Sequence, residues 1–185
     1  KKWDLIDQNA INLGWDDESI NEEKTHTAVK TIFGIEKDDF LAKVAKVYMA
    51  LQKDGKGSIY CDDSLEKYSN FNSKTKNEIM PNKFDIVLAN PPFGKDIKVT
   101  GEEKLSQYKL ASGLNGKMKK DMRPDILFLE RCIDLAKDGG KIGIILVETY
   151  FHTPTSKYIR NLLKDHNIQF ICDLPHNTFR PFCNA

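Results

Sequence analysis

Residues 84–94 read FDIVLANPPFG and carry the strongest structural signal in the chain. The first six residues form an almost continuous apolar run, which is typical of a strand buried on both faces of a parallel sheet. The strand runs directly into Asn90-Pro91-Pro92-Phe93, and the prolines remove backbone N–H donors and fix the turn. An Asn amide oxygen beside an unpaired carbonyl offers two acceptors to a planar amino group, on which an aromatic ring can stack. The motif predicts a site for such an amine; the alternative is a strand that ends in an ordinary Asn-Pro turn.

Strand and helix patterns alternate on both sides of this stretch. Apolar runs predict strands at 31–35, 58–61, 141–147 and 168–173. Helical spacing predicts helices at 40–51 with Asp38 as cap, at 124–136 ended by Gly139-Gly140, and at 156–164. Such alternation indicates the α/β class, with a doubly wound, Rossmann-like parallel sheet whose ligands bind at the carboxyl ends of the strands. Those ends carry acidic or amide side chains: Glu36, Asp63, Asn90, Glu148 and Asp173.

Composition excludes several classes of protein. The 185 residues carry a net charge of only +1, which excludes a histone-like protein that binds nucleic acid through an overall positive charge. No apolar run approaches the ~20 residues of a membrane span, and the first residues contain no apolar signal region. The four cysteines show no CxxC spacing, which argues against a zinc site or a disulfide framework. We therefore expect a cytoplasmic domain without a metal or a membrane partner.

The motif and its surroundings resemble a known family. FDIVLANPPFG resembles the catalytic strand and loop of amino-methyltransferases that use S-adenosylmethionine. IFGIEKDDFLAKVAKVYMAL, CDDSL, RPDILFLERCIDLAKDGGKIGIIL and CDLPHNTFRPF extend the likeness, in the same order, to the end of the chain. Together they resemble the N6-adenine DNA methyltransferase, or modification (M), subunit of type I restriction–modification systems. The resemblance implies that residues 31–185 form a partial catalytic domain. Residues 1–30, which precede it, are a polar N-terminal segment with weak helical character.

The resemblance also implies roles for single residues. Glu36 would hold the ribose hydroxyls of S-adenosylmethionine, or is an exposed acid at a strand end. Asp63, with Asp62 as the less favoured choice, would accept from the adenine amine of the cofactor, and Ile35 and Leu65 would flank that adenine or belong to the core. Asn90 and the Pro91 carbonyl, fixed by Pro92, would accept from the target amine. Phe93 would stack on the flipped base, and Phe179 would pack against it or be a core residue.

Residues 94–123 form a long segment rich in Lys and Gly without a clear period. Such a charge run is a solvated face or, as the functional alternative, a mobile loop over the DNA backbone. In the second interpretation Lys119, Lys120 and Arg123 would contribute salt-dependent affinity for double-stranded DNA. The resemblance further implies a specificity subunit, which would choose the DNA sequence, and a restriction subunit as partners.

One family feature is missing from the sequence. Family members carry a strand that ends in an Asp-Pro-x-x-Gly-x-Gly turn, which approaches the methionine part of the cofactor and lies at the centre of the sheet. Residues 1–30 contain only the isolated Gly14. A final antiparallel strand also has no counterpart, and the chain begins without Met. We therefore expect a fragment of a longer protein.

Two other functions remain open from the sequence. An Asn-Pro-Pro clamp suits any planar amine, so RNA or a protein glutamine amide is an alternative substrate. A chain without the Gly-rich turn is also compatible with a non-catalytic fragment that serves in subunit assembly.

Overall fold

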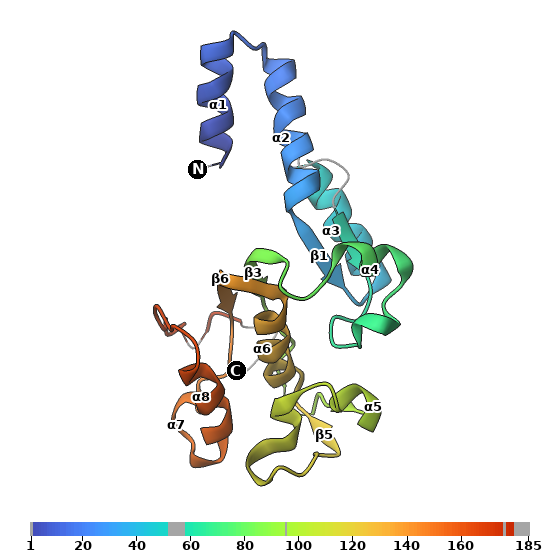
Figure 1. Ribbon diagram of the computed structural model, residues 1–185, viewed down its shortest axis with the longest axis vertical. Coiled ribbons are helices and arrows are strands. Elements are labelled where there is room, and N and C mark those ends of the chain that lie inside the picture. Colours follow the sequence, from blue (N-terminus) through green and yellow to red (C-terminus); the bar gives the residue numbers. More distant parts are fainter. Residues whose placement is uncertain (1, 52–57, 95, 176, 180–185) are drawn as a thin grey trace. The chain divides into compact units, whose positions relative to one another are not determined.

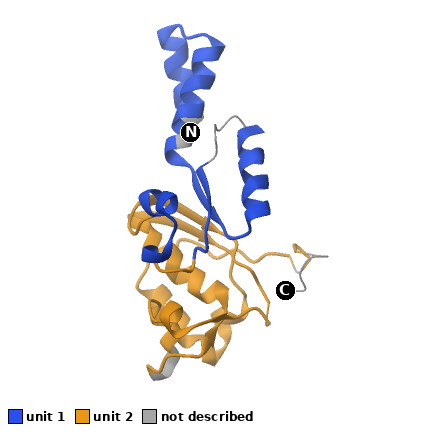
Figure 2. Ribbon diagram, turned by 90° about the vertical axis from the view of Figure 1, so that its right-hand side faces the viewer, with its two compact units in different colours: residues 1–64, 68–79 blue, residues 65–67, 80–185 orange. Residues whose placement is uncertain are grey.

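The computed structural model describes residues 2–51, 58–94, 96–175 and 177–179 (Figure 1). Contacts divide the chain into two compact units, shown in Figure 2. Unit 1 contains residues 1–64 and 68–79, and unit 2 contains residues 65–67 and 80–185. Among the described residues no helix combines the length and the apolar character needed to cross a membrane.

Unit 1 is mainly helical, with one pair of strands. Its elements are α1 (Lys2–Leu13), α2 (Asp17–Thr31), β1 (Phe33–Glu36), α3 (Asp39–Leu51), β2 (Ser58–Cys61), the 3-10 turn η1 (Tyr68–Asn70) and α4 (Ser73–Glu78). α1 and α2 pair as a helical hairpin (Figure 1). The weak helical expectation for residues 1–30 is therefore too cautious. The Asp16 carboxylate explains the second helix, because it accepts from the Ser19 N–H and caps the first turn of α2.

β1 and β2 form a parallel pair in the register Phe33↔Ser58 to Glu36↔Cys61. Helix α3 packs on this pair, and Asp38 caps it by accepting from the Leu41 N–H at 2.9 Å, as the sequence predicts. The strand predicted at 31–35 begins later, because α2 continues through Thr31.

The apolar face of α3, which its helical spacing predicts, is largely exposed in the described structure. Two strands are too narrow to cover the helix. The large apolar side chains of the face are instead exposed by about half or more: Phe40 71%, Leu41 51%, Val44 48%, Val47 60%, Tyr48 62% and Leu51 75%.

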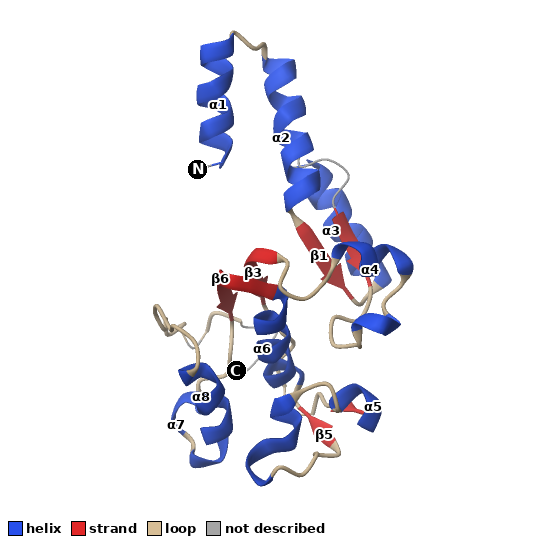
Figure 3. Ribbon diagram, in the orientation of Figure 1, coloured by secondary structure: helices blue, strands red, loops and turns tan. Residues whose placement is uncertain are grey.

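Unit 2 combines two strand pairs with helices. Its elements are β3 (Phe84–Ala89), β4 (Val99–Thr100), α5 (Glu102–Leu105), the 3-10 helix η2 (Lys109–Asn115), β5 (Asp121–Met122), α6 (Pro124–Leu135), β6 (Ala136–Ile144), α7 (Thr149–His152), the 3-10 turn η3 (Pro154–Ser156) and α8 (Lys157–Lys164). Figure 3 shows the strands in red: β3 pairs with β6 in parallel, and β4 pairs with β5 in antiparallel. The described residues thus form a mixed α/β structure with small parallel sheets. One continuous doubly wound sheet is not among them.

Gly139 and Gly140 were expected to end the helix before them, but they lie within β6. The helix ends at Leu135, and the register of β6 against β3 shifts between Phe84 and Ile86. Gly139 has a positive φ of 74°, and a Cβ on Gly140 would meet the Lys137 carbonyl oxygen at 2.7 Å. The two glycines therefore permit an irregularity in the strand that no other residue pair would tolerate as well.

β3 is paired as predicted, yet only one of its faces is covered. Helix α6 packs on the β3–β6 pair, while Ile86 and Leu88 on β3 remain 63% and 79% exposed. The expectation of burial on both faces is therefore wrong. The strand predicted at 168–173 is also wrong: these residues, all described, form no strand, and Phe170 and Ile171 are 81% and 65% exposed. An apolar run needs a paired strand edge as well as a strand-like composition.

The core of unit 2 lies between α6, α8 and the segment that follows β3. Residues 94–123, whose sequence shows no clear period, contain β4, α5, η2 and β5. Several of their side chains are buried with residues of α6 and α8, namely Leu105, Tyr108, Leu110, Ala111 and Met122.

Candidate functional site

The Asn90–Phe93 motif lies directly after β3, at its carboxyl end. β3 stops there because the two prolines cannot donate to a strand partner. The Ala89 carbonyl makes the last contact of the strand, accepting from the Ile145 N–H at 3.2 Å. Asn90 and Pro92 are exposed, Pro91 is fully buried and Phe93 is half-buried. A buried proline therefore fixes the turn next to an exposed Asn90.

Phe93 and Phe179 lie against each other, although 86 positions separate them in the sequence. Their ring centroids are 5.8 Å apart and the planes are tilted by 48°. This spacing is that of two aromatic rings in direct contact. The structure thus brings together the two aromatic residues that the sequence assigned to one base.

Glu36 and Ile35 lie at the end of β1, in unit 1, and both are half-buried. One carboxylate oxygen of Glu36 accepts from the Asp38 N–H at 2.9 Å. This contact turns the side chain toward the start of α3 and fixes its orientation. A carboxylate oxygen has two lone pairs, so Glu36 retains acceptor capacity for a diol.

Asp62 and Asp63 differ in their surroundings, although they are adjacent. One oxygen of Asp62 accepts from the backbone N–H and the side-chain amide of Asn72, at 2.9 and 2.8 Å. The other accepts from the Asp63 N–H at 3.1 Å. Asp62 is therefore a turn residue after β2. The Asp63 carboxylate pairs with the Lys37 ammonium at 2.9 Å, and their side chains are 19% and 75% exposed. The role of Asp63, or of Asp62, toward the cofactor adenine stays a prediction.

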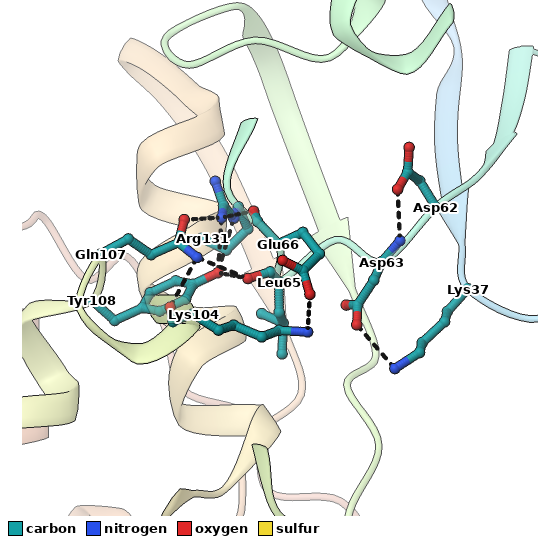
Figure 4. A network of polar contacts seen from close by, with 9 residues as sticks. All are labelled: Lys37, Asp62, Asp63, Leu65, Glu66, Lys104, Gln107, Tyr108 and Arg131. Carbon is teal, nitrogen blue, oxygen red and sulfur yellow. Dashed lines mark hydrogen bonds and ion pairs between the residues drawn. The ribbon is translucent and has the colours of Figure 1, made fainter. Parts of the chain in front are cut away.

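Leu65 is 3% exposed and belongs to the core of unit 2. Its role beside the cofactor adenine stays a prediction, and the core interpretation accounts for its side chain. Its backbone carbonyl accepts from the Tyr108 hydroxyl and from the Gln107 amide, both at 3.0 Å (Figure 4).

The three cations predicted to contact DNA have different surroundings in unit 2. The Lys119 ammonium lies 4.8 Å from the ring centroid of Tyr158, and Lys120 is exposed. Arg123 donates to both oxygens of Asp125, at 3.1 and 3.2 Å, and its side chain is 21% exposed. Arg123 therefore neutralises a fully buried carboxylate, which accounts for its position without DNA. Contact of the three cations with DNA stays a prediction.

Sequence reasoning missed the buried polar groups around α6. Asp125 also accepts from the Tyr150 hydroxyl at 2.7 Å, and burial together with this hydrogen bond raises the pKa of Tyr150 well above its ordinary value. Glu130 accepts from the Lys109 and Leu110 N–H groups and so caps η2. Arg131, 3% exposed, contacts Tyr108 and Gln107. A sequence signal exists, because these charges interrupt the apolar run of α6, but their partners are distant in sequence.

Family comparison places the chain among known enzymes. A family model described as N-6 DNA methylase matches residues 15–184, nearly the whole chain. The chain therefore belongs to the N-6 DNA methylase family, which makes it a DNA methyltransferase by class. Membership implies the fold of S-adenosylmethionine-dependent methyltransferases. The boundary predicted at residue 30 between an N-terminal segment and a catalytic domain stays a prediction.

Proposed function

We propose that this chain transfers a methyl group from S-adenosylmethionine to the N6 amine of adenine in double-stranded DNA. Its context is the modification subunit of a type I restriction–modification system, with the specificity and restriction subunits as partners. The observation that supports this best is the exposed Asn90 amide at the end of β3, beside the contact between Phe93 and Phe179. The parallel pairs β1–β2 and β3–β6 each support a Rossmann-like, doubly wound sheet, of which the proposal makes this chain a part.

The target amine is the reacting group on the substrate side. Its two hydrogens fit the Asn90 amide oxygen and the Pro91 carbonyl, because both are acceptors held by one rigid turn. Donating both hydrogens orients the lone pair of the nitrogen for attack, and one of these hydrogens leaves as a proton to solvent once the nitrogen carries the methyl group. Phe93 supplies a face on which the base stacks once it leaves the helix. No side chain needs to act as nucleophile, so positioning and polarisation account for catalysis.

The carboxylates at the strand ends fit S-adenosylmethionine by their chemistry. Glu36 accepts hydrogen bonds in a fixed orientation, as a ribose diol requires. Asp63 is the acid for the adenine amine of the cofactor, with Lys37 as a cation that can leave it. When bound, the cofactor supplies an electrophilic methyl group on a sulfonium. The residues of this chain hold that cofactor and orient the amine that attacks it.

The test is methyl transfer by the intact protein, with the specificity subunit supplied and tritiated S-adenosylmethionine as donor. Substrates are duplex DNA, ribosomal RNA and a glutamine-containing peptide. We expect label in DNA, recovered as N6-methyladenine after digestion to nucleosides. Label in RNA or peptide alone would replace the proposed substrate. Absence of transfer, together with no heat of S-adenosylmethionine binding in calorimetry, would instead indicate a role in subunit assembly. Co-purification with the specificity subunit tests the restriction–modification context separately.

A further inference from the structure

Residues 65–67 follow the candidate acid Asp63 in the chain and are held by an unusual polar network, shown in Figure 4. Arg131 on α6 is its centre, and its side chain is 4% exposed. One guanidinium nitrogen lies 2.7 Å from the Glu66 carbonyl oxygen. The charged group of a helix residue therefore binds the backbone of a segment that lies 65 positions earlier.

Two relays run from the same guanidinium to the Leu65 carbonyl. In the first, the Arg131 Nε–H donates to the Tyr108 hydroxyl at 3.2 Å, and that hydroxyl donates to the Leu65 carbonyl at 3.0 Å. In the second, Arg131 donates to the Gln107 amide oxygen at 2.8 Å, and the Gln107 amide nitrogen donates to the same carbonyl at 3.0 Å. Donors and acceptors agree in direction throughout, so both lone pairs of that carbonyl are used.

Side-chain ion pairs add to the hold on this segment. The Lys104 ammonium binds the Glu66 carboxylate at 2.8 Å, and Lys67 approaches Glu103 at 3.4 Å. Three consecutive residues are thus fixed to α5, to Gln107 and Tyr108 before η2, and to α6. Stability alone is a weak explanation for this arrangement, because the desolvation of a buried guanidinium offsets much of its attraction. A role in holding residues 65–67 in place explains the network better.

We infer that Arg131, Tyr108 and Gln107 are positioning residues for the cofactor side of the methyltransferase. They fix the backbone of Leu65 and Glu66, directly after Asp63 and Ser64. The inference rests on the proposed function, because Asp63 and Leu65 are its candidate residues for the cofactor adenine. These three residues touch no reacting atom. They set where unit 2 presents Leu65, two residues after Asp63 in the chain.

The matched pair Tyr108→Phe and Tyr150→Phe tests this inference. Both substitutions remove one buried hydroxyl from unit 2, and the residues are 4% and 6% exposed. Only Tyr108 contacts residues 65–67, whereas the Tyr150 hydroxyl binds Asp125. In the intact protein we expect Tyr108→Phe to raise Kd and KM for S-adenosylmethionine about three- to tenfold, the effect of losing net hydrogen bonds. We expect kcat within about twofold, since the target amine is held elsewhere, and Tyr150→Phe should leave Kd for S-adenosylmethionine within about twofold.

Hydrogen exchange of the amides at residues 65–67 provides a readout that needs no cofactor. It should accelerate in Tyr108→Phe and stay unchanged in Tyr150→Phe. Faster exchange with unchanged Kd would overturn the positioning role and leave the proposed function intact. Equal weakening of cofactor binding by both substitutions would show a merely structural role and also overturn it. Absence of S-adenosylmethionine binding by the wild-type protein would overturn the proposed function, and the positioning role with it, whatever the exchange shows.

Discussion

Asn90 is exposed at the end of β3, while the neighbouring Pro91 is buried, so the amide can be removed without disturbing the turn. We expect Asn90→Ala to lower methyl transfer by about 10²–10³, the usual effect of losing one preorganised hydrogen-bonding group. Binding of S-adenosylmethionine, followed by calorimetry, should be nearly unchanged. Asn161→Ala, an exposed amide on α8, is the matched control. Activity of Asn90→Ala within threefold of wild type would refute the clamp.

Substitution of Glu36 tests binding of the cofactor separately from binding of the target base. We expect Glu36→Ala to weaken the binding of S-adenosylmethionine by about 1.5–3 kcal/mol, because charge-assisted hydrogen bonds to the ribose would be lost. Glu36→Gln keeps an oxygen that can accept from the Asp38 N–H, and so separates loss of charge from loss of the local turn. Titration of each variant gives the dissociation constants, with Glu18→Ala on α2 as the control. Identical constants for wild type and Glu36→Ala would leave Glu36 as a strand-end acid only.

The contact between Phe93 and Phe179 makes a specific prediction about base flipping. A base that stacks on Phe93 would lie next to the ring of Phe179, since the two ring centroids are 5.8 Å apart. Phe93→Ala should raise KM for DNA and lower kcat, at a loss of about 1–3 kcal/mol for base–aromatic stacking. Phe93→Trp should keep much of the activity, because it retains a π-face.

Fluorescence of 2-aminopurine at the target position measures extrusion directly. It should increase when wild-type protein binds hemimethylated duplex with the specificity subunit present, and the increase should shrink in Phe93→Ala. Phe170→Ala is the control, since that ring is 81% exposed and distant in sequence from the motif. If Phe93→Ala keeps the full rate and the full signal, Phe93 is a packing residue.

Helix α6 contains a buried thiol, that of Cys132, which makes the stability of the fold depend on pH. Burial raises the pKa of the Cys132 thiol to about 12, whereas Cys61 and Cys172 are exposed. The folded state therefore keeps a proton that the unfolded state releases near its ordinary thiol pKa of about 8.5. This contribution to stability is complete below pH 8 and is lost as pH rises toward 12. Iodoacetamide at pH 8 should modify Cys61 and Cys172 well before Cys132, as peptide mass mapping would show. Equal rates for all three would contradict the burial of Cys132.

The elements that sequence analysis located correctly are those fixed by local chemistry. The Asp38 cap, the apolar run of β3 and the proline at the start of α6 each act within a few residues, and each lies where expected. Interactions between distant segments were harder to predict. The run at 168–173 has strand composition but no strand partner among the described residues, and the apolar pattern of α3 gave no indication of how little covers it.

In the candidate site, too, features set by neighbouring residues could be predicted, and features set by contacts between distant segments could not. Asn90 and Phe93 follow from four adjacent residues, and their place at a strand end follows from the strand itself. Arg131 could not be assigned, because its partners at 66 and 108 are identified only once the chain has folded. The partners of the acidic pair after β2 could not be predicted either: Asn72 binds Asp62, and Lys37 binds Asp63.

The molecule as a whole exposes more large apolar side chains than a stable monomer normally does. They occur in both units and include Phe40, Leu51, Leu88 and Phe170, each more than 70% exposed. Exposed apolar side chains of this size favour association where they gather into patches. We expect the 185-residue chain by itself to self-associate with rising concentration and to bind the dye ANS, measured by sedimentation velocity and fluorescence. A strictly monomeric chain without dye binding would show that these side chains are covered in solution.

The network around Arg131 also has a consequence for the order of folding. Its contact with Glu66 closes a loop of 65 residues, and contacts of such sequence separation form slowly because closure costs chain entropy. Helix α6, by contrast, is built from contacts within a few residues. The backbone after Asp63 therefore becomes fixed only after α6 has formed. During synthesis the ribosome completes Glu66 65 residues before Arg131, so the Glu66 carbonyl waits for a partner that has not yet been made.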